Sequence, residues 1–195
     1  MADEVREGIP EDGDAVEEPP APVPPSDDVA AAVWTAFPEV VFVDSHGQAV
    51  LYVPRGQLAD IARFLFVEQQ FSQVVDITAV DHQRNLTRDV PGVALERFEV
   101  VANLLSHMRN RRLRLIAEVP EGDPSVPSLT PLFPGVELAE REVYDLFGIT
   151  FDGHPDLTRI LMPDDWEGHP LRKDDATSRV PVQFKAAGVA RPRVD

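Results

Sequence analysis

Cysteine is absent from all 195 residues of this chain. The chain therefore cannot form a disulfide, use a thiolate nucleophile or supply the cysteine ligands of an iron–sulfur cluster. Long apolar runs are absent too, because no window approaches the ~18 apolar residues of a membrane-spanning helix. The start, Met-Ala-Asp-Glu, has neither the basic nor the apolar segment of a secretory signal. We therefore expect a protein of the cytoplasmic compartment with no direct membrane span.

Several sequence motifs of enzymes and nucleic-acid binders are also missing. The chain has no Gly-x-Gly-x-x-Gly loop, no phosphate loop and no Gly-x-Ser-x-Gly elbow. Its net charge is −16, and its one local basic cluster is Arg109, Arg111, Arg112 and Arg114. The solvated end of a hairpin explains that cluster more economically than a phosphate-binding face. We expect no nucleic-acid partner.

The charge is concentrated at the N-terminus. Residues 1–28 hold ten acidic side chains, one basic side chain and six prolines. Such a segment cannot bury enough apolar surface to offset the entropy of ordering it, so we predict a disordered acidic tail over 1–28. The other 167 residues carry a net charge of −7 and are enough for one folded domain.

Hydrophobic periodicity predicts the elements of the first half. A short helix begins at Val29, capped by Asp27 or Asp28, and stops before Pro38. Residues 40–44 and 48–53 flank Ser-His-Gly and form a hairpin. A helix follows Pro54, with apolar residues at the 3–4 spacing of one buried face, and ends near Gln70.

The second half alternates between apolar and polar positions. Residues 74–81, 98–104 and 113–119 are predicted strands, the first with Val75, Ile77 and Ala79 on one side, and 107–110 is a turn. Residues 120–128 form a loop, and 136–147 a helix with Gly148 just after its end. The fold class is α+β, with a mostly antiparallel sheet packed with helices over 29–150. An extended, proline-rich C-terminal segment over 151–195 wraps the domain or a partner.

Residues 140–173 alternate charged and rigid residues and contain the triplet Gly-His-Pro twice. Proline and glycine fix the backbone there, which suits a surface held in one shape against a partner. Arg141 and Asp145 are spaced for an i, i+4 ion pair on the helix. We interpret ten residues as structural or interface residues: Glu140, Arg141, Glu142, Tyr144, Asp145, His154, Arg159, His169, Arg172 and Lys173.

Two catalytic alternatives use the same segment. His154 and His169, together with Asp156, Asp164, Asp165 and Glu167, offer ligand atoms for zinc or iron. The histidines lie fifteen positions apart in separate turns, so structural hydrogen bonding is favoured over a metal site. Glu140, Glu142 and Asp145 could serve as general acid and base, but an ion network is favoured, in which Arg159, Arg172 and Lys173 pair with these carboxylates. We therefore assign no catalytic, cofactor-binding or metal-binding residue.

The run Glu-Arg-Glu-Val-Tyr-Asp-Leu-Phe-Gly-Ile at 140–149, with the two Gly-His-Pro turns, resembles the C subunit of bacterial NADH:quinone oxidoreductase. That is the 30-kDa-type subunit of respiratory complex I. The stretch 75–81 and the hairpin from 98 to 115 are similar to the same family, so the resemblance covers roughly residues 35–185.

The resemblance implies a non-redox structural and assembly subunit of the hydrophilic arm, peripheral to the cytoplasmic side of the cell membrane. It implies contact with the D subunit, which carries the quinone site, and FMN and Fe-S clusters on partner subunits. The complex passes electrons from NADH to quinone and translocates protons. Two other interpretations remain: the equivalent subunit of a related membrane-bound hydrogenase or other-donor dehydrogenase, and a stand-alone metalloenzyme.

Overall fold

The computed structural model describes residues 25–85 and 87–175. Within them lie the helices α1 (Asp28–Ala36), α2 (Leu58–Val67) and α3 (Glu137–Phe147), with 3-10 turns η1 (Arg55–Gln57) and η2 (Pro134–Val136). The strands are β1 (Val41–Ser45), β2 (Gln48–Val53), β3 (Gln73–Asp81), β4 (Phe98–Ser106), β5 (Arg111–Val119), β6 (Ser125–Pro127) and β7 (Thr150–Asp152). Most of the predicted acidic tail, residues 1–24, lies outside the described residues. No helix in the described ranges is long and apolar enough to cross a membrane.

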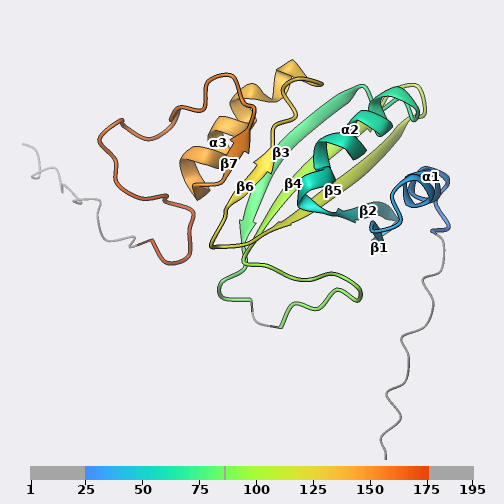
Figure 1. Ribbon diagram of the computed structural model, residues 1–195, viewed down its shortest axis with the longest axis horizontal. Helices are drawn as coiled ribbons and strands as arrows, with labels where there is room; N and C mark the ends of the chain where they lie inside the picture. The colour runs from blue at the N-terminus through green and yellow to red at the C-terminus, as the bar shows by residue number, and fades with distance from the viewer. Residues whose placement is uncertain (1–24, 86, 176–195) are drawn as a thin grey trace, which may run out of the picture.

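Five strands form one sheet in the order β1-β2-β5-β4-β3, and β6 pairs with β7 in a second, two-stranded sheet (Figure 1). In the larger sheet only β2 and β5 run parallel. The first hairpin turns through His46 and Gly47, whose φ angles are 55° and 78°. These positive values are those of the two-residue turns that match strand twist. The predicted α+β class with a mostly antiparallel sheet is confirmed.

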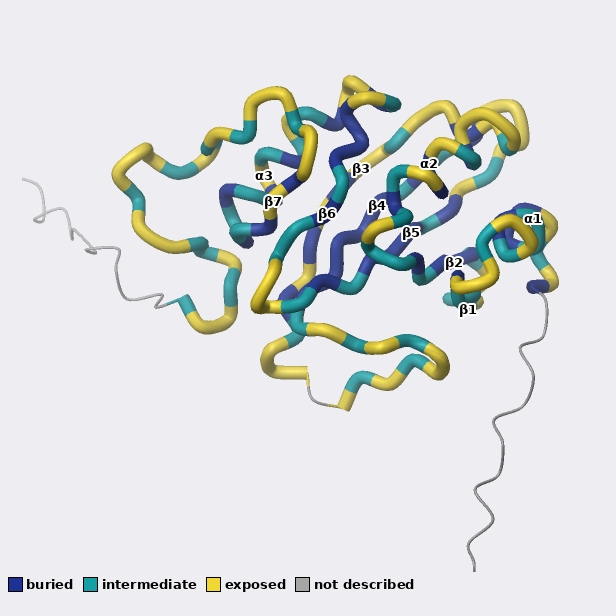
Figure 2. Tube along the Cα trace, viewed as in Figure 1, coloured by how far each residue is buried: buried dark blue, intermediate teal, exposed yellow. Residues whose placement is uncertain are grey.

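The helices pack on one face of the large sheet. Buried residues of all three helices share a single apolar core with alternate residues of the strands, among them Leu51, Phe98 and Leu115. This core is the dark band along the strands and under α2 in Figure 2. The opposite face holds a small cluster of Val50, Val101 and Ile116 among polar side chains. The alternation predicted for β4 and β5 is therefore confirmed, and the result is a helix-on-sheet sandwich.

Three details differ from the sequence prediction. A register shift between Val74 and Asp76 turns Val75 to solvent at 51% exposure, whereas Ile77 and Ala79 are buried. The helix after Pro54 ends at Val67 rather than near Gln70. Parts of the predicted loop 120–128 form β6, which pairs in parallel with β7. Strands this short and proline-flanked carry too little periodicity to be recognised from sequence.

The arginine-rich end of the β4–β5 hairpin is partly neutralised within the chain. Arg109 pairs with Asp28 at 3.2 Å, and Arg111 pairs with both Asp27 and Asp28. Asp27 also caps α1 by accepting hydrogen bonds from the backbone N–H groups of residues 29 and 30. The N-terminal edge of the fold is thus tied to the hairpin by charge.

Residues 153–175 contain no helix or strand, and we call them the strap. The strap leaves β7, swings outward beyond α3 and returns toward the end of β3 (Figure 1). The backbone N–H of Leu171 donates to the carbonyl of Leu146 at 3.0 Å, which fixes the returning limb beside the end of α3.

Candidate interaction site

The residues singled out from the sequence meet where the strap lies against α3. This helix ends at Gly148, whose φ of 71° gives the left-handed turn that stops a helix. A Cβ added at Gly148 would lie 2.5 Å from the ring of His169 and 2.8 Å from the guanidinium of Arg172. Glycine is therefore required here both for its backbone conformation and for the close approach of the strap.

Asp145 is the central acceptor of this contact. Its side chain has no solvent exposure, and Oδ1 lies 2.7 Å from Nη1 of Arg159. Its Oδ2 accepts hydrogen bonds from three consecutive backbone N–H groups, those of residues 160, 161 and 162, at 2.8–3.1 Å. Burial alone would raise the pKa of Asp145, but these donors, led by the N–H of residue 162, outweigh it and lower the pKa. One carboxylate therefore fixes both the side chain and the backbone of the strap.

Arg141 binds the strap through two backbone carbonyls and one hydroxyl. Its Nε donates to the carbonyl of Thr158 at 3.0 Å, and Nη2 donates to the Thr158 hydroxyl at 2.7 Å and to the carbonyl of Arg159 at 3.2 Å. The predicted i, i+4 ion pair with Asp145 is wrong, because strap donors occupy the Asp145 oxygens. The predicted pairing of Asp145 with Arg159 does form.

Glu140 faces the opposite direction and does not meet an arginine, contrary to the expected pairing with Arg159 or Arg172. It is fully buried, with Oε2 2.6 Å from the hydroxyl of Ser128 and Oε1 2.7 Å from the backbone nitrogen of Leu129. Burial raises the pKa of Glu140, and its two hydrogen bonds offset this only in part. Glu140 therefore orders the segment before α3 rather than the strap.

Glu142 lies on the exposed side of this helix. Within the described ranges, no hydrogen bond or ion pair engages its carboxylate. The general acid–base alternative needed Glu142 beside Asp145, but Asp145 is buried and already saturated with donors. The arrangement holds an ion network and offers no free carboxylate dyad within the described part of the chain.

The two histidines act at opposite ends of α3. Nε2 of His154 lies 3.1 Å from the carbonyl of Glu137, and Nδ1 of His169 lies 2.9 Å from the carbonyl of Asp145. The His169 ring also meets the Tyr144 ring edge-on, with centroids 6.3 Å apart. Among the described residues, no group of three or more His, Asp or Glu side chains is placed to hold a metal ion.

Arg172 holds the end of the strap against the C-terminal end of α3. Its Nε donates to the carbonyl of Phe147 at 2.5 Å, and its guanidinium lies 5.1 Å from the centroid of the buried Phe98 ring. A helix C-terminus favours cations because its last carbonyls are unsatisfied. Arg172 therefore fastens the strap to the helix through backbone carbonyls and an aromatic ring.

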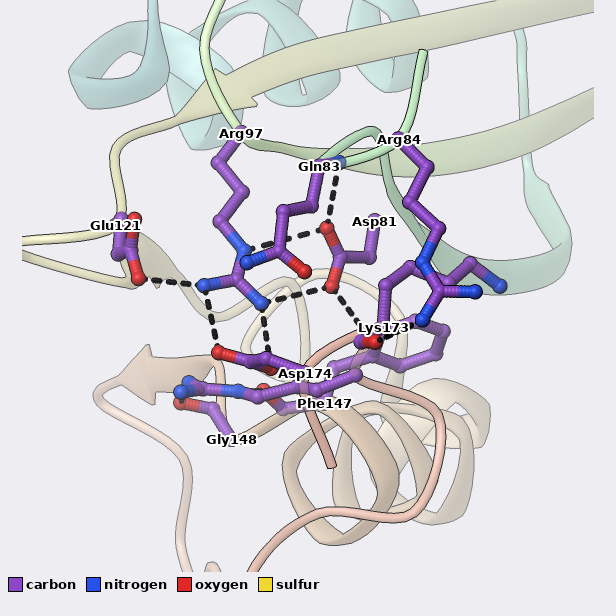
Figure 3. A network of polar contacts seen from close by, with 10 residues as sticks. Asp81, Gln83, Arg84, Arg97, Glu121, Phe147, Gly148, Lys173 and Asp174 are labelled. Atoms are coloured by element: carbon purple, nitrogen blue, oxygen red, sulfur yellow. Dashed lines mark hydrogen bonds and ion pairs between the residues drawn. The ribbon is translucent and has the colours of Figure 1, made fainter. Parts of the chain in front are cut away.

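A second anchor, missed at the sequence level, lies at the end of β3 (Figure 3). Asp81 pairs with Arg97 at 2.9 Å and accepts the backbone N–H of Lys173 at 2.8 Å. Arg97 also pairs with Asp174 at 2.7 Å and with Glu121 at 2.5 Å. Figure 3 shows the Arg97 guanidinium pointing at all three carboxylates, two from the domain and one from the strap.

The electrostatics of this anchor favour the charged states. Burial would raise the pKa of Asp81, but Arg97 and the backbone donors of Lys173 and Gln83 lower it to about 2. Hydrogen bonds to the carboxylates of Asp81, Asp174 and Glu121 raise the pKa of Arg97. One signal in the sequence pointed here: Asp81 continues the alternation of the buried Ile77 and Ala79, and a carboxylate at a buried position requires a cation.

Together these features define a class of protein: a helix-on-sheet domain whose buried charges hold a C-terminal strap. The chain belongs to the family of the respiratory-chain NADH dehydrogenase 30 Kd subunit, whose family model matches residues 51–180. It is 40% identical over 174 residues to the NADH-quinone oxidoreductase C subunit of Salinispora arenicola, covering 85% of this chain and 67% of that one. It is 45% identical over 154 residues to the C subunit of Herpetosiphon aurantiacus, covering 78% and 85%.

The chain spans 62% of the length of another relative, the C subunit from a Nocardioides species. Among solved structures, a trypsin-resistant fragment of Nqo5 matches with a TM-score of 0.56 and 32% identity, over 66% of this chain and 96% of the fragment. A chain of an archaeal membrane-bound sulfane sulfur reductase matches with a TM-score of 0.64 over 82% of this chain and 94% of that one. At 20% identity, this second match shows a shared fold.

Proposed function

We propose that this chain is a non-redox structural and assembly subunit in the hydrophilic arm of an NADH:quinone oxidoreductase. The main support for this proposal is family membership, because relatives at 38–45% identity are named as the C subunit of that enzyme. The complete absence of cysteine supports a role without an iron–sulfur cluster on this chain. In this proposal FMN and the Fe-S clusters sit on partner subunits, and the chain is peripheral on the cytoplasmic side of the membrane.

The strap would then serve as the interface with the other hydrophilic-arm subunits, the quinone-site D subunit among them. Intrachain contacts through Asp145, Arg141 and Arg172 support this, because they hold the strap backbone in one conformation before a partner arrives. A pre-organised segment loses less conformational entropy on binding. The exposed side chains of the strap, such as Leu161 and Leu171, would be free to contact the partner.

We propose the organisation 1–28 acidic tail, 29–150 domain and 151–195 partner-binding segment. β7, at 150–152, crosses the second boundary and joins that segment to the domain. In the described residues the domain also holds the strap through Asp81 and Arg97. The segment would therefore dock as an extension of the domain, with its path set by the anchors rather than by chain flexibility.

Affinity purification of the tagged full chain from mildly solubilised membranes tests the proposed function. We expect flavin and iron–sulfur proteins to co-purify, together with NADH:quinone activity. Co-purification with proteins that take electrons from a donor other than NADH would instead assign the chain to a related complex. A free monomer containing stoichiometric zinc or iron would support the metalloenzyme and overturn the proposal.

Arg141→Ala tests the role of the strap in assembly. It removes three hydrogen bonds to the strap, so we expect less assembled complex but near-normal NADH turnover per assembled complex. Arg63→Ala on the exposed surface of α2 is the matched control and should assemble normally. Normal assembly of Arg141→Ala with lost turnover would point to a direct catalytic role instead.

A further inference from the structure

A compact charge cluster lies on the sheet face opposite the helices. Nη1 of Arg88 lies 2.8 Å from Oε1 of Glu99, and its Nη2 lies 2.5 Å from Oε2 of Glu118. Nε2 of His82 lies 2.9 Å from the other oxygen of Glu99, but without the geometry of a hydrogen bond. The two glutamate side chains are only 8% and 10% exposed, so the cluster is almost sealed from solvent.

The carboxylates of this cluster outnumber its permanent cations. Two buried carboxylates face one permanent cation, Arg88, and His82 adds a second cation only when it is protonated. Oε1 of Glu118 is buried and, among the described residues, has no hydrogen-bond partner. Burial, ahead of any neighbour, raises the pKa of Glu118. A buried carboxylate oxygen that lacks a partner is costly, so the cluster lacks one cation or donor at Glu118.

A pocket of about 180 Å³ opens beside that carboxylate. It lies between residues 92–94 and strands β1, β2 and β5, and its lining includes Glu39, Tyr52 and Glu118. Tyr52 pairs with Ile116 across the sheet and is influenced by the Glu118 charge, so its ring stands on the same face beside the carboxylate. The walls also include valines 41, 53 and 93, which suit an alkyl stem.

Arg55 also lines the pocket but does not neutralise it. Its guanidinium lies 2.9 Å from the carboxylate of Asp123 and donates to the carbonyls of residues 123 and 125. The remaining charged groups of the lining are Glu39 and Glu118, both carboxylates. The pocket therefore combines apolar walls with a negative lining, and one of its carboxylates, Glu118, has a buried oxygen without a partner among the described residues.

We propose that this pocket receives the cationic end of a lysine or arginine side chain from a neighbouring protein, with Glu118 as its principal acceptor. The alkyl stem would pack on the valine walls, as long basic side chains do when only their ends need polar contacts. The cation would complete the charge balance of the Arg88–Glu99–Glu118 cluster. The identity of the occupant as a partner's side chain rests on the proposed function, but the cation selectivity of the pocket does not.

Agmatine, an alkylguanidinium that mimics an arginine side chain, tests the pocket on the isolated full chain by NMR titration. We expect saturable shifts of the backbone amides of Tyr52, Val93 and Ala94, with millimolar affinity. Urea, which lacks the charge, should produce no saturable shift at these positions. Glu118→Gln should weaken agmatine binding by about tenfold or more, because a charge-assisted hydrogen bond is replaced by a neutral one.

Two further variants keep the test decisive. Asp89→Asn removes the same charge from an exposed position that does not line the pocket, so agmatine should bind it normally. Ala94→Phe places bulk at an exposed lining residue and should block agmatine even if Glu118→Gln fails to fold. Unsaturable shifts, or equal affinity for Glu118→Gln, would overturn the site. So would a crystal structure with an ordered water on Glu118 that agmatine does not displace.

The source of the cation is tested in membranes. Glu118→Gln should lower co-purification of the neighbouring subunits relative to Asp89→Asn. Agmatine affinity in the low micromolar range, with unchanged co-purification, would mean a free small cation and would overturn the partner assignment. Because agmatine binding is measured on the isolated chain, it can succeed even if the chain belongs to no complex.

Discussion

Glu140 and Asp145 lie five residues apart on α3, and both side chains are fully buried, yet their pKa values shift in opposite directions. Burial raises the pKa of both groups, but only at Asp145 do the hydrogen-bond donors outweigh it and lower the pKa. Glu140 receives one hydroxyl and one backbone N–H. Asp145 receives three backbone N–H groups and a guanidinium.

The number and charge of the donors therefore decide whether a buried carboxylate stays ionised. Glu140 and Asp145 also have separate structural roles. Donors to Asp145 come from the strap, so ionisation of Asp145 is coupled to strap docking. Donors to Glu140 come from residues 128 and 129, so Glu140 orders the chain that enters η2 and α3. Substitutions at the two positions should therefore have effects on stability that differ in magnitude and in pH dependence. They should also release different segments of the chain.

Asp145→Ala should give the largest effect. Removing the carboxylate leaves the Arg159 guanidinium and three backbone N–H groups without their acceptor. Loss of one partner from a buried ion pair costs about 3–5 kcal/mol. Urea unfolding should show this loss, and limited trypsin digestion should show faster cleavage at Arg159. Glu142→Ala on the exposed side of the same helix is the control, and a similar loss there would refute the special role of Asp145.

Gly148→Ala tests the contact between the strap and the C-terminal end of α3 by adding a Cβ to the helix-ending glycine. The new Cβ would meet His169 and Arg172 at distances that force the strap to move, and the residue must also hold a positive φ. We expect a loss of about 2–3 kcal/mol, more than a strained φ alone would cause. Gly153→Ala is a matched comparison, because Gly153 has a φ of 86° and no atom near an added Cβ. Equal losses would show that strap contact at Gly148 contributes nothing.

Asp81, in the second anchor, is another buried carboxylate whose donors lower its pKa. Its ordinary pKa of 3.8 falls to about 2 in the fold, so ionised Asp81 stabilises the folded state above the unfolded pKa. That contribution, about 2 kcal/mol, should be lost as pH falls from about 5 to about 2. Urea unfolding across this range should show a steeper decline for the wild-type chain than for Asp81→Asn. Parallel pH profiles would mean that the Arg97 contact does not depend on the Asp81 charge.

Local patterns in the sequence predicted the framework well. The alternation of β4 and β5, the hairpin at His46 and Gly47 and the helix ending at Gly148 all follow from periodicity and turn chemistry. These signals are local, so they survive in a single sequence. The bulge at Val75 could not be predicted, because a register shift depends on the partner strand.

The ionic anchors were predictable only in part. The charge pattern singled out Asp145 and Arg159, but it assigned Arg141 to the wrong partner because helix spacing ignores the strap. Lys173 was chosen for its side-chain charge, whereas its backbone N–H and carbonyl make the contacts with Asp81 and Arg84. Asp81 and Lys173 are 92 positions apart, and no spacing rule brings them together.

Glu140→Gln should have the smallest effect and the opposite pH signature. The amide keeps the shape of the carboxyl group, its oxygen can still accept from Leu129, and no charge is buried. Because the folded-state pKa of Glu140 is raised, its charge opposes folding above that pKa, and the penalty disappears as pH falls below the unfolded value. We expect a change within about 1 kcal/mol of wild type, shifting in favour of the variant as pH rises. Unfolding free energies at pH 5 and pH 8 measure this, with Glu140→Ala as the variant that leaves the Leu129 N–H unsatisfied. A large, pH-independent loss in Glu140→Gln would mean that Glu140, like Asp145, is held in its ionised form by its two donors alone.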